Sequence, residues 1–184
     1  MRLLAPFVCS LALLAACSSS VLYPVTTPPI SGSVNTSVRS LEVRDVSLPS
    51  YAAAEEITIQ NSDGSLSTAG SALWADIPVR AISLELSRNI AALTGARVAS
   101  EPWPFETRPQ ARLEVRMDEL LPGADGVYRG SGQYFVGSTE GGRDRAGSFA
   151  LSVPFDPKGG PLAISRARGQ LIQNLARKIA TEAM

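Results

Sequence analysis

The side chains of this sequence that could act as general acids and bases are its carboxylates. Two acids that flank a glycosidic bond can cleave it, and the candidates here are Asp76, Asp118, Glu119 and the adjacent pair Glu55 and Glu56. The sequence has no histidine and only two cysteines, so neither a Ser-His-Asp or Cys-His arrangement nor the usual zinc site of nitrogen and sulfur ligands can be built. Each acid also fits a structural role, such as a helix cap or a solvated strand face. We therefore predict that the chain is not an enzyme and has no metal site and no cofactor.

Cys17 offers a different chemistry, because it ends the run Leu14-Ala15-Ala16-Cys17 behind a short apolar segment that starts beside Arg2. A charged start, an apolar middle and small residues at the end are typical of a secretory signal. The run resembles the lipobox of bacterial lipoproteins. This resemblance implies a signal peptide over residues 1–16, whose removal leaves Cys17 as the first residue, acylated for example with palmitate.

Two other interpretations of this segment stay open. One is an ordinary secreted protein that is cut near Ala16, and the other is an uncleaved membrane anchor, although the segment is shorter than the about 20 apolar residues that span a bilayer. Ser18 follows the cysteine, at the position where an aspartate would resemble an inner-membrane retention signal. We therefore expect a lipid anchor in the outer membrane, facing the periplasm.

The charge of the chain argues against nucleic acid as a partner. Removal of residues 1–16 takes away Arg2 and leaves one basic residue fewer than the 17 acidic ones. The two kinds of charge are interspersed, whereas nucleic-acid binding needs a basic stripe that neutralises phosphates. The same pattern provides no polybasic membrane patch, so membrane attachment would depend on the acyl chains.

The composition predicts a tether followed by one domain. Residues 17–36 are rich in serine, threonine, proline and glycine, and as a flexible coil their ends would lie on the order of 25 Å apart. The alternative is that Val21, Leu22 and Tyr23 pack on the domain. Residues 37–184 are numerous enough for a single core without disulfides.

Alternating apolar and polar residues predict most of the strands. The clearest strand covers 112–118, where three apolar side chains alternate with charged ones. Glycines at 130, 132 and 137 indicate a bulge or a close backbone approach. The other segments with this alternation are 38–48, 57–60, 65–68, 97–100, 127–137 and 149–155, and residues 61–64 supply a hairpin turn between two of them.

Spacings of three and four predict two helices. In the first, Asp76 can cap the start, Pro78 suits the first turn and Gly95 suits the position after the end. The apolar faces consist of Val79, Ile82, Leu86, Ile90 and Leu93 in the first helix and of Ile164, Ala167, Leu171, Leu175 and Ile179 in the second. The predicted fold class is α+β, with a largely antiparallel or mixed sheet and two amphipathic helices on one of its faces.

Several features, taken in order, resemble the PqiC-like ABC-type transport auxiliary lipoproteins. The resemblance covers about residues 37–181, and Ala52-Ala53-Ala54 and Gln60 depart from the family pattern. The features are the lipobox at Cys17, Leu48-Pro49-Ser50-Tyr51, Ile57 and Ile59, Leu73-Trp74, Asn89 and Leu93, Pro102-Trp103, Leu113-Glu114-Val115-Arg116 and the apolar terminal helix.

This resemblance implies a component of an MCE-type lipid transport system that docks an MCE-domain protein at the outer membrane, forms a homo-oligomer, and contributes to lipid trafficking and envelope integrity. The alternative is a carrier that holds a lipid or lipopolysaccharide between helices and sheet. The candidate partner-interface residues are Tyr51, Trp74, Trp103 and Tyr134, because aromatic residues are enriched at binding hot spots. Core packing is the other interpretation of each.

Overall fold

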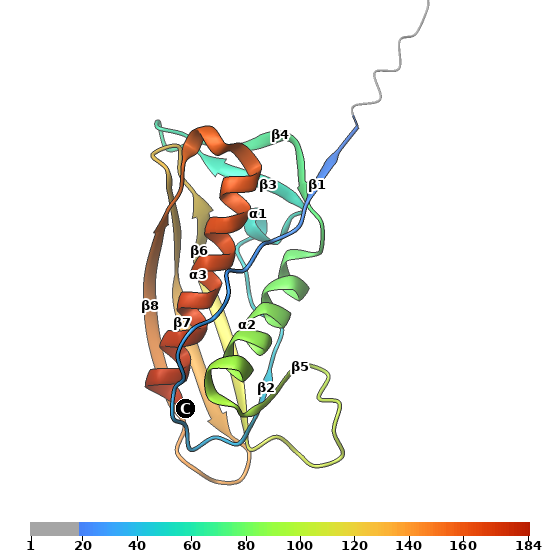
Figure 1. The fold of residues 1–184 in the computed structure, drawn as a ribbon, viewed down its shortest axis with the longest axis vertical. Helices are drawn as coiled ribbons and strands as arrows, with labels where there is room; N and C mark the ends of the chain where they lie inside the picture. The colour runs from blue at the N-terminus through green and yellow to red at the C-terminus, as the bar shows by residue number, and fades with distance from the viewer. Residues whose placement is uncertain (1–18) are drawn as a thin grey trace, which may run out of the picture.

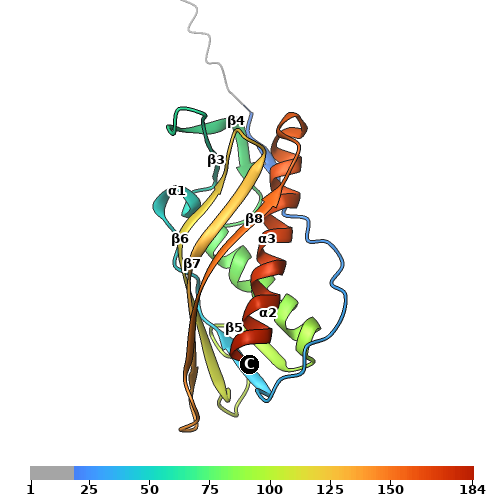
Figure 2. The ribbon, with the colours of Figure 1, turned by 90° about the vertical axis from the view of Figure 1, so that its left-hand side faces the viewer.

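A five-stranded sheet with two helices on one face forms the body of the molecule (Figures 1 and 2). The computed structural model describes residues 19–184, so the predicted signal peptide and Cys17 lie outside the described residues. The predicted α+β class is confirmed. In the order across the sheet, the strands are β5 (Arg97–Ser100), β2 (Ser40–Val43), β6 (Ala111–Pro122), β7 (Val127–Ser138) and β8 (Arg145–Pro154), and the covering helices are α2 (Pro78–Thr94) and α3 (Gly160–Ala183).

The sheet is mixed in direction. Strand β2 is parallel to both β5 and β6, whereas β6, β7 and β8 form an antiparallel meander. The strand predicted over residues 38–48 covers only Ser40–Val43. Beyond it, the Asp45 amide donates to Glu101 Oε1 at 2.7 Å and the Val46 amide donates to Ser83 Oγ of α2 at 3.2 Å, so neither amide pairs with a strand. Pairing resumes only as an isolated bridge between Ser47 and Arg116.

A second, three-stranded sheet lies at one end of the molecule. Its order is β1 (Val21–Tyr23), β4 (Leu66–Trp74) and β3 (Glu56–Gln60). The predicted hairpin turn joins β3 to β4, where the Asn61 amide donates to the Ser65 carbonyl at 2.8 Å and Gly64 has a φ of 87°. Short helical turns, α1 (Ser50–Ala53) and η1 (Pro157–Gly159), precede β3 and α3.

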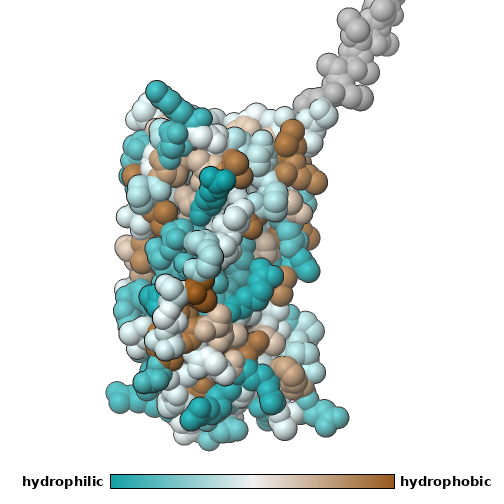
Figure 3. All heavy atoms as spheres, viewed as in Figure 1, coloured by the Kyte–Doolittle hydropathy of each residue, from teal (hydrophilic) through white to brown (hydrophobic). Residues whose placement is uncertain are grey.

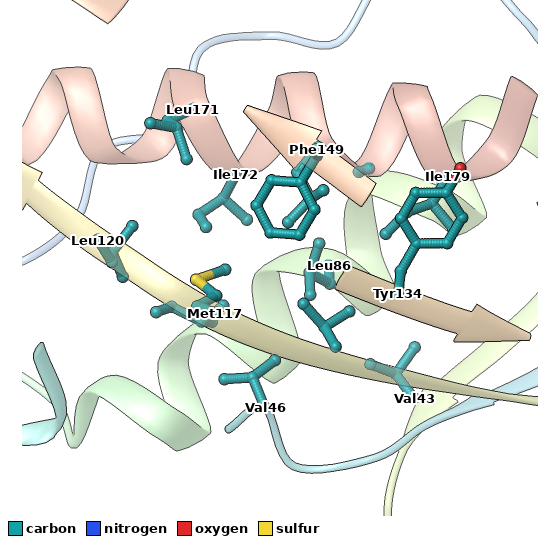
Figure 4. Packing of buried hydrophobic residues seen from close by; sticks show 14 of the residues in the cluster. Val43, Val46, Leu86, Met117, Leu120, Tyr134, Phe149, Leu171, Ile172 and Ile179 are labelled. Carbon is teal, nitrogen blue, oxygen red and sulfur yellow. The ribbon is translucent and has the colours of Figure 1, made fainter. Parts of the chain in front are cut away.

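The core lies between the five-stranded sheet and the two helices (Figure 4). Strand glycines allow the helix layer to come close, because a Cβ on Gly130 would lie 2.8 Å from Leu171 Cδ2. Gly132 pairs with Met117 beside the register shift in β6. The predicted close approach and bulge are therefore both confirmed. Side chains that fill this core include Val43, Met117, Leu120 and Phe149 from the sheet and Leu86, Leu171, Ile172 and Ile179 from the helices.

The ends of α2 follow the predicted signals with one exception. Pro78 occupies the first turn, and Gly95 adopts the left-handed conformation with a φ of 68° while its amide donates to the Ala91 carbonyl. Asp76 is not the cap, because Ile77 takes that position. The Asp76 carboxylate instead accepts from the Ile77 amide at 2.9 Å and pairs with Arg80 one turn later.

The prediction of a flexible tether is wrong for residues 21–34, which we call the strap. The strap runs along α3 (Figure 1), and β1 at its start pairs with β4, as the alternative interpretation expected. Side chains of α3 donate to strap carbonyls: Ser165 to Pro24 at 2.7 Å, Gln173 to Pro28 at 2.9 Å and Arg177 to Ser31 at 2.6 Å. Proline and serine carbonyls accept such bonds without a periodic apolar pattern, so the strap is ordered although its composition is that of a linker.

Candidate functional site

Two of the four candidate interface aromatics lie inside the domain. Trp74 at the end of β4 is 7% exposed and Tyr134 in β7 is 2% exposed. The Tyr134 hydroxyl donates to Glu182 Oε2 at 2.6 Å, and burial, together with this carboxylate, raises the pKa of Tyr134 to about 12. In the folded monomer these two side chains pack in the core, as the alternative interpretation expected.

Tyr51 and Trp103 are partly exposed and lie far apart in the fold. Tyr51 in α1 lines a small crevice with Trp74 and Tyr128, and burial raises its pKa. Trp103 belongs to the loop of residues 101–110 between β5 and β6, at the end of the molecule opposite to β1 (Figure 1). The structure therefore does not bring the four aromatics together into one surface.

The loop of residues 101–110 is an ordered aromatic projection. The Trp103 and Phe105 rings meet edge to face with centroids 4.9 Å apart, and the Arg97 guanidinium lies 5.0 Å from the Phe105 centroid. Phe105 is 42% exposed. The Trp103 indole donates to the Thr107 carbonyl at 2.7 Å, which fixes the ring within the loop.

A buried acid holds this loop to the sheet. Glu42 in β2 accepts from the Trp103 amide at 3.1 Å through one oxygen and from Arg112 Nε at 2.6 Å through the other. Glu42 is only 8% exposed, so its carboxylate is satisfied by these two bonds. Glu42 lies in the segment 38–48 that the sequence predicts as a strand, and nothing local in the sequence indicates its contact with residue 103.

The candidate acids fall at three places in the fold. Glu55 precedes β3 and Glu56 is its first residue, and both are exposed. Asp118 is exposed in β6, and Glu119 beside it is half-buried. The Asp76 carboxylate forms an ion pair with Arg80. Within residues 19–184, no group of three or more histidine, cysteine, aspartate or glutamate side chains is arranged to hold a metal ion.

A pair of buried charges lies between the two helices. Arg168 of α3 and Glu85 of α2 have side chains that are 1% and 5% exposed, with 3.9 Å between the nearest nitrogen and oxygen. The Arg168 guanidinium lies over the Trp74 ring, 4.5 Å from its centroid. Burial raises the pKa of the Glu85 carboxyl, and the positive charges of Arg168 and Arg88 partly offset this rise.

The sequence analysis missed both members of this pair. Glu85 lies three residues after Ile82 and Arg168 lies three residues before Leu171, so each interrupts an apolar helix face. A charge at such a position is the available signal, since charged residues are almost never fully buried unless they are paired. Whether Glu85 and Arg168 face each other depends on how the two helices pack, which the sequence of each helix does not show.

A cavity of about 350 Å³ opens beside the pair. Its walls are Tyr23–Val25 of the strap, Trp74–Asp76 and one side of α2, with Arg80, Arg88, Glu85 and Arg168 among the lining residues. A second cavity, of about 500 Å³, lies between the strap, the end of β8 and the start of α3. None of the helices within residues 19–184 is long and apolar enough to cross a membrane.

Comparison with known proteins places these features in a family. The family model described as "ABC-type transport auxiliary lipoprotein component" matches residues 23–180. A search of curated proteins finds no match. A solved structure of an uncharacterized protein has 20% identity and a TM-score of 0.71, with 88% of this chain and 97% of that chain covered. A protein of the family DUF330 from Xanthomonas campestris has 14% identity and a TM-score of 0.64, with 86% and 92% covered. At such identities the two structures show a shared fold.

Proposed function

Since this chain belongs to the family of ABC-type transport auxiliary lipoprotein components, we propose that it is the outer-membrane docking component of an MCE-type lipid transport system. The family makes the chain a lipoprotein component of ABC-type transport. The proposal adds the MCE-domain partner, the outer-membrane address and lipid as the cargo. The observation that supports it most is the extent of the family match, which runs from residue 23 in the strap to residue 180 and so covers nearly the whole domain.

The strap supports an anchored position close to the bilayer. Strand β1 begins at Val21, four residues after Cys17, and four extended residues span at most about 14 Å. Exposed Val21 and Leu22 add apolar surface at this end, and Figure 3 shows apolar atoms next to the start of the described chain. A lipidated Cys17 would hold the β1 end at the membrane and direct the loop of residues 101–110 toward the periplasm.

That loop is the surface we assign to the partner. It carries an exposed aromatic ring on a rigid base, which is the form of an interface hot spot. Glu42 and the indole hydrogen bond fix the loop before binding, so little conformational entropy would be lost on docking. Trp103 is the candidate contact within this loop, and Tyr51 stays a candidate only for a separate contact, because it lies far from the loop. Trp74 and Tyr134 are no longer candidates, because they are buried.

The test compares two substitutions of equally exposed apolar residues. Phe105→Ser removes the ring at the far end, and Leu66→Ser is the matched control, since the two residues are 42% and 45% exposed. The lipidated full chain would be cross-linked in native membranes and the recovered MCE-domain protein quantified. A hot spot of about 2 kcal/mol corresponds to an approximately 30-fold weaker complex for Phe105→Ser only. Equal recovery with both variants, or no MCE-domain protein with the parent chain, would contradict the proposal.

A lipid carrier is the second candidate function, and the 500 Å³ cavity favours it. Pro28, Val153, Phe155 and Ala163 contribute apolar lining there, and its volume lies within the range of ligand pockets. Native mass spectrometry of gently purified protein would show a bound lipid if the chain carries one. A clean ligand-free mass would count against the carrier and leave the docking proposal in place.

Self-association is a further part of the proposal. Strands β5 and β8 are the two edges of the five-stranded sheet, and edge strands present backbone groups that a second copy can pair with. Light scattering of the detergent-solubilised lipoprotein measures the number of copies. If the protein stays monomeric at all micromolar concentrations, self-association is not part of its function.

A further inference from the structure

The buried pair Arg168–Glu85 has hydrogen-bonding capacity that the protein leaves unused. The 3.9 Å separation of Arg168 Nη2 and Glu85 Oε1 is too long for a hydrogen bond. Within the described chain, Arg168 Nε and Nη2 and Glu85 Oε2 have no hydrogen-bond partner. Buried polar groups are nearly always satisfied, and each of these atoms has less than 1 Å² of exposed surface, so a further molecule can bond to them only after the two side chains shift.

The 350 Å³ cavity lies beside the pair and is the side from which such a molecule can approach it. Arg168 and Glu85 both line it, and the Trp74 ring under the guanidinium restricts the plane in which Arg168 can donate. Arg80 and Arg88 of α2 lie on the same cavity. A cavity of this size holds a small polar group together with some water.

The charges around the cavity match a zwitterion. Asp76 is neutralised by Arg80, so the side chains that remain are Arg88 and Arg168 on the positive side and Glu85 on the negative side. A phosphate accepts well from guanidinium groups, and a primary ammonium would donate to the Glu85 carboxylate. A simple anion would satisfy the arginine donors but would leave the Glu85 oxygen unsatisfied.

The position of the cavity brings it near a membrane surface. Its wall includes Tyr23, which is six residues from Cys17, a distance of at most about 20 Å in extended chain. We propose that this cavity binds a phosphate that carries a primary ammonium, as in a phosphoethanolamine headgroup, with the phosphate on Arg168 and Arg88 and the ammonium on Glu85. The proposal needs no MCE-domain partner, so it can fail or hold independently of the docking function.

Calorimetric titration of the full-length, detergent-solubilised lipoprotein tests this site. The probes are dihexanoyl phosphatidylethanolamine, dihexanoyl phosphatidylglycerol, free phosphoethanolamine and inorganic phosphate. We expect the ethanolamine lipid to bind at least fivefold more tightly than the glycerol lipid, which lacks the ammonium. Tighter binding of the lipid than of free phosphoethanolamine identifies membrane lipid as the source, and equal binding identifies a soluble phosphoamine. Both results uphold the recognition chemistry.

Variants distinguish a binding site from a structural ion pair. Arg168→Gln should weaken binding at least tenfold, and Arg88→Gln, an exposed position that cannot unfold the core, at least threefold. Glu85→Gln should abolish the preference for the ethanolamine lipid. Arg39→Gln removes the same charge from an exposed position outside both cavities and should change affinity less than twofold. Absence of saturable binding by the parent chain, or equal affinities for the parent, Arg88→Gln and Arg39→Gln, would overturn the proposal.

Discussion

Gly169 in the middle of α3 provides the sharpest test of the strap. A Cβ at this position would overlap the Thr26 carbonyl oxygen and would lie 3.0 Å from the Thr26 carbonyl carbon and 3.1 Å from Thr27 Cα. All three are backbone atoms, which a side-chain rotation cannot remove. In Gly169→Ala the strap must therefore move away from α3 at residues 26–27.

The expected change in the free energy of unfolding for Gly169→Ala combines a loss from the strap and a gain from the helix. The hydrogen bonds on either side of the contact, from Ser165 to Pro24 and from Gln173 to Pro28, contribute about 1 to 1.5 kcal/mol each. Alanine is better than glycine inside a helix by about 1 kcal/mol. We therefore expect a net loss of about 1 to 2 kcal/mol in the free energy of unfolding. Without the strap contact the same substitution would stabilise the protein by about 1 kcal/mol.

Urea unfolding followed by circular dichroism measures this difference. Arg166→Ala, at an exposed position of the same helix, is the control and should change stability by less than about 0.5 kcal/mol. A double-mutant cycle adds a second criterion: Gln173→Ala should cost about 1 kcal/mol in the parent and much less in Gly169→Ala, because the bond to Pro28 is already lost. A more stable Gly169→Ala variant whose effect simply adds to that of Gln173→Ala would refute the ordered strap.

Three further predictions follow from other contacts. Tyr134→Phe should lower the free energy of unfolding by about 1 kcal/mol at pH 7. Hydrogen bonds from Lys178 and Tyr134 lower the pKa of Glu182, so the stabilisation from these bonds is lost as the pH falls through the folded-state pKa. The difference in urea midpoint between parent and variant should therefore narrow at acid pH. Gly132→Ala should lower the free energy of unfolding, measured by thermal denaturation, by about 2 kcal/mol or more, because its Cβ would overlap the backbone of β6. A Cβ on Gly137 in the same strand meets no atom closer than 3.9 Å, so Gly137→Ala should lower it by under about 0.5 kcal/mol. Cys17→Ala should move the protein from the membrane to the soluble fraction with an unchanged circular dichroism spectrum; persistent membrane fractionation would contradict the lipid anchor.

Local sequence signals were sufficient where one element carries its own information. Strand β6 was predicted because Leu113, Val115 and Met117 alternate with charges and all three are buried. The ends of α2 were predicted from Pro78 and Gly95, whose backbone preferences do not depend on distant residues. Asp76 was misassigned because a carboxylate before a helix can equally well pair with an arginine in the first turn.

Long-range contacts account for what the sequence did not predict. The strap is held by Ser165, Gln173 and Arg177, each more than 140 residues away in the sequence, and carbonyl acceptors have no residue-type signature. Glu42 reaches Trp103 across 61 residues. The facing of Glu85 and Arg168 likewise depends on the packing of two helices whose own patterns predict only that each has an apolar face.

The strap also links the anchor to the cavity. Tyr23, Pro24 and Val25 form one wall of the 350 Å³ cavity, and the same segment is fixed to α3 at Ser165, one turn before Arg168. Any displacement of the strap at residues 24–27 would therefore move a cavity wall relative to the guanidinium. If the cavity binds a headgroup, Gly169→Ala should weaken that binding although residue 169 does not line the cavity. Unchanged affinity in a variant whose strap is shown to be released would mean that the cavity binds through its helix side alone.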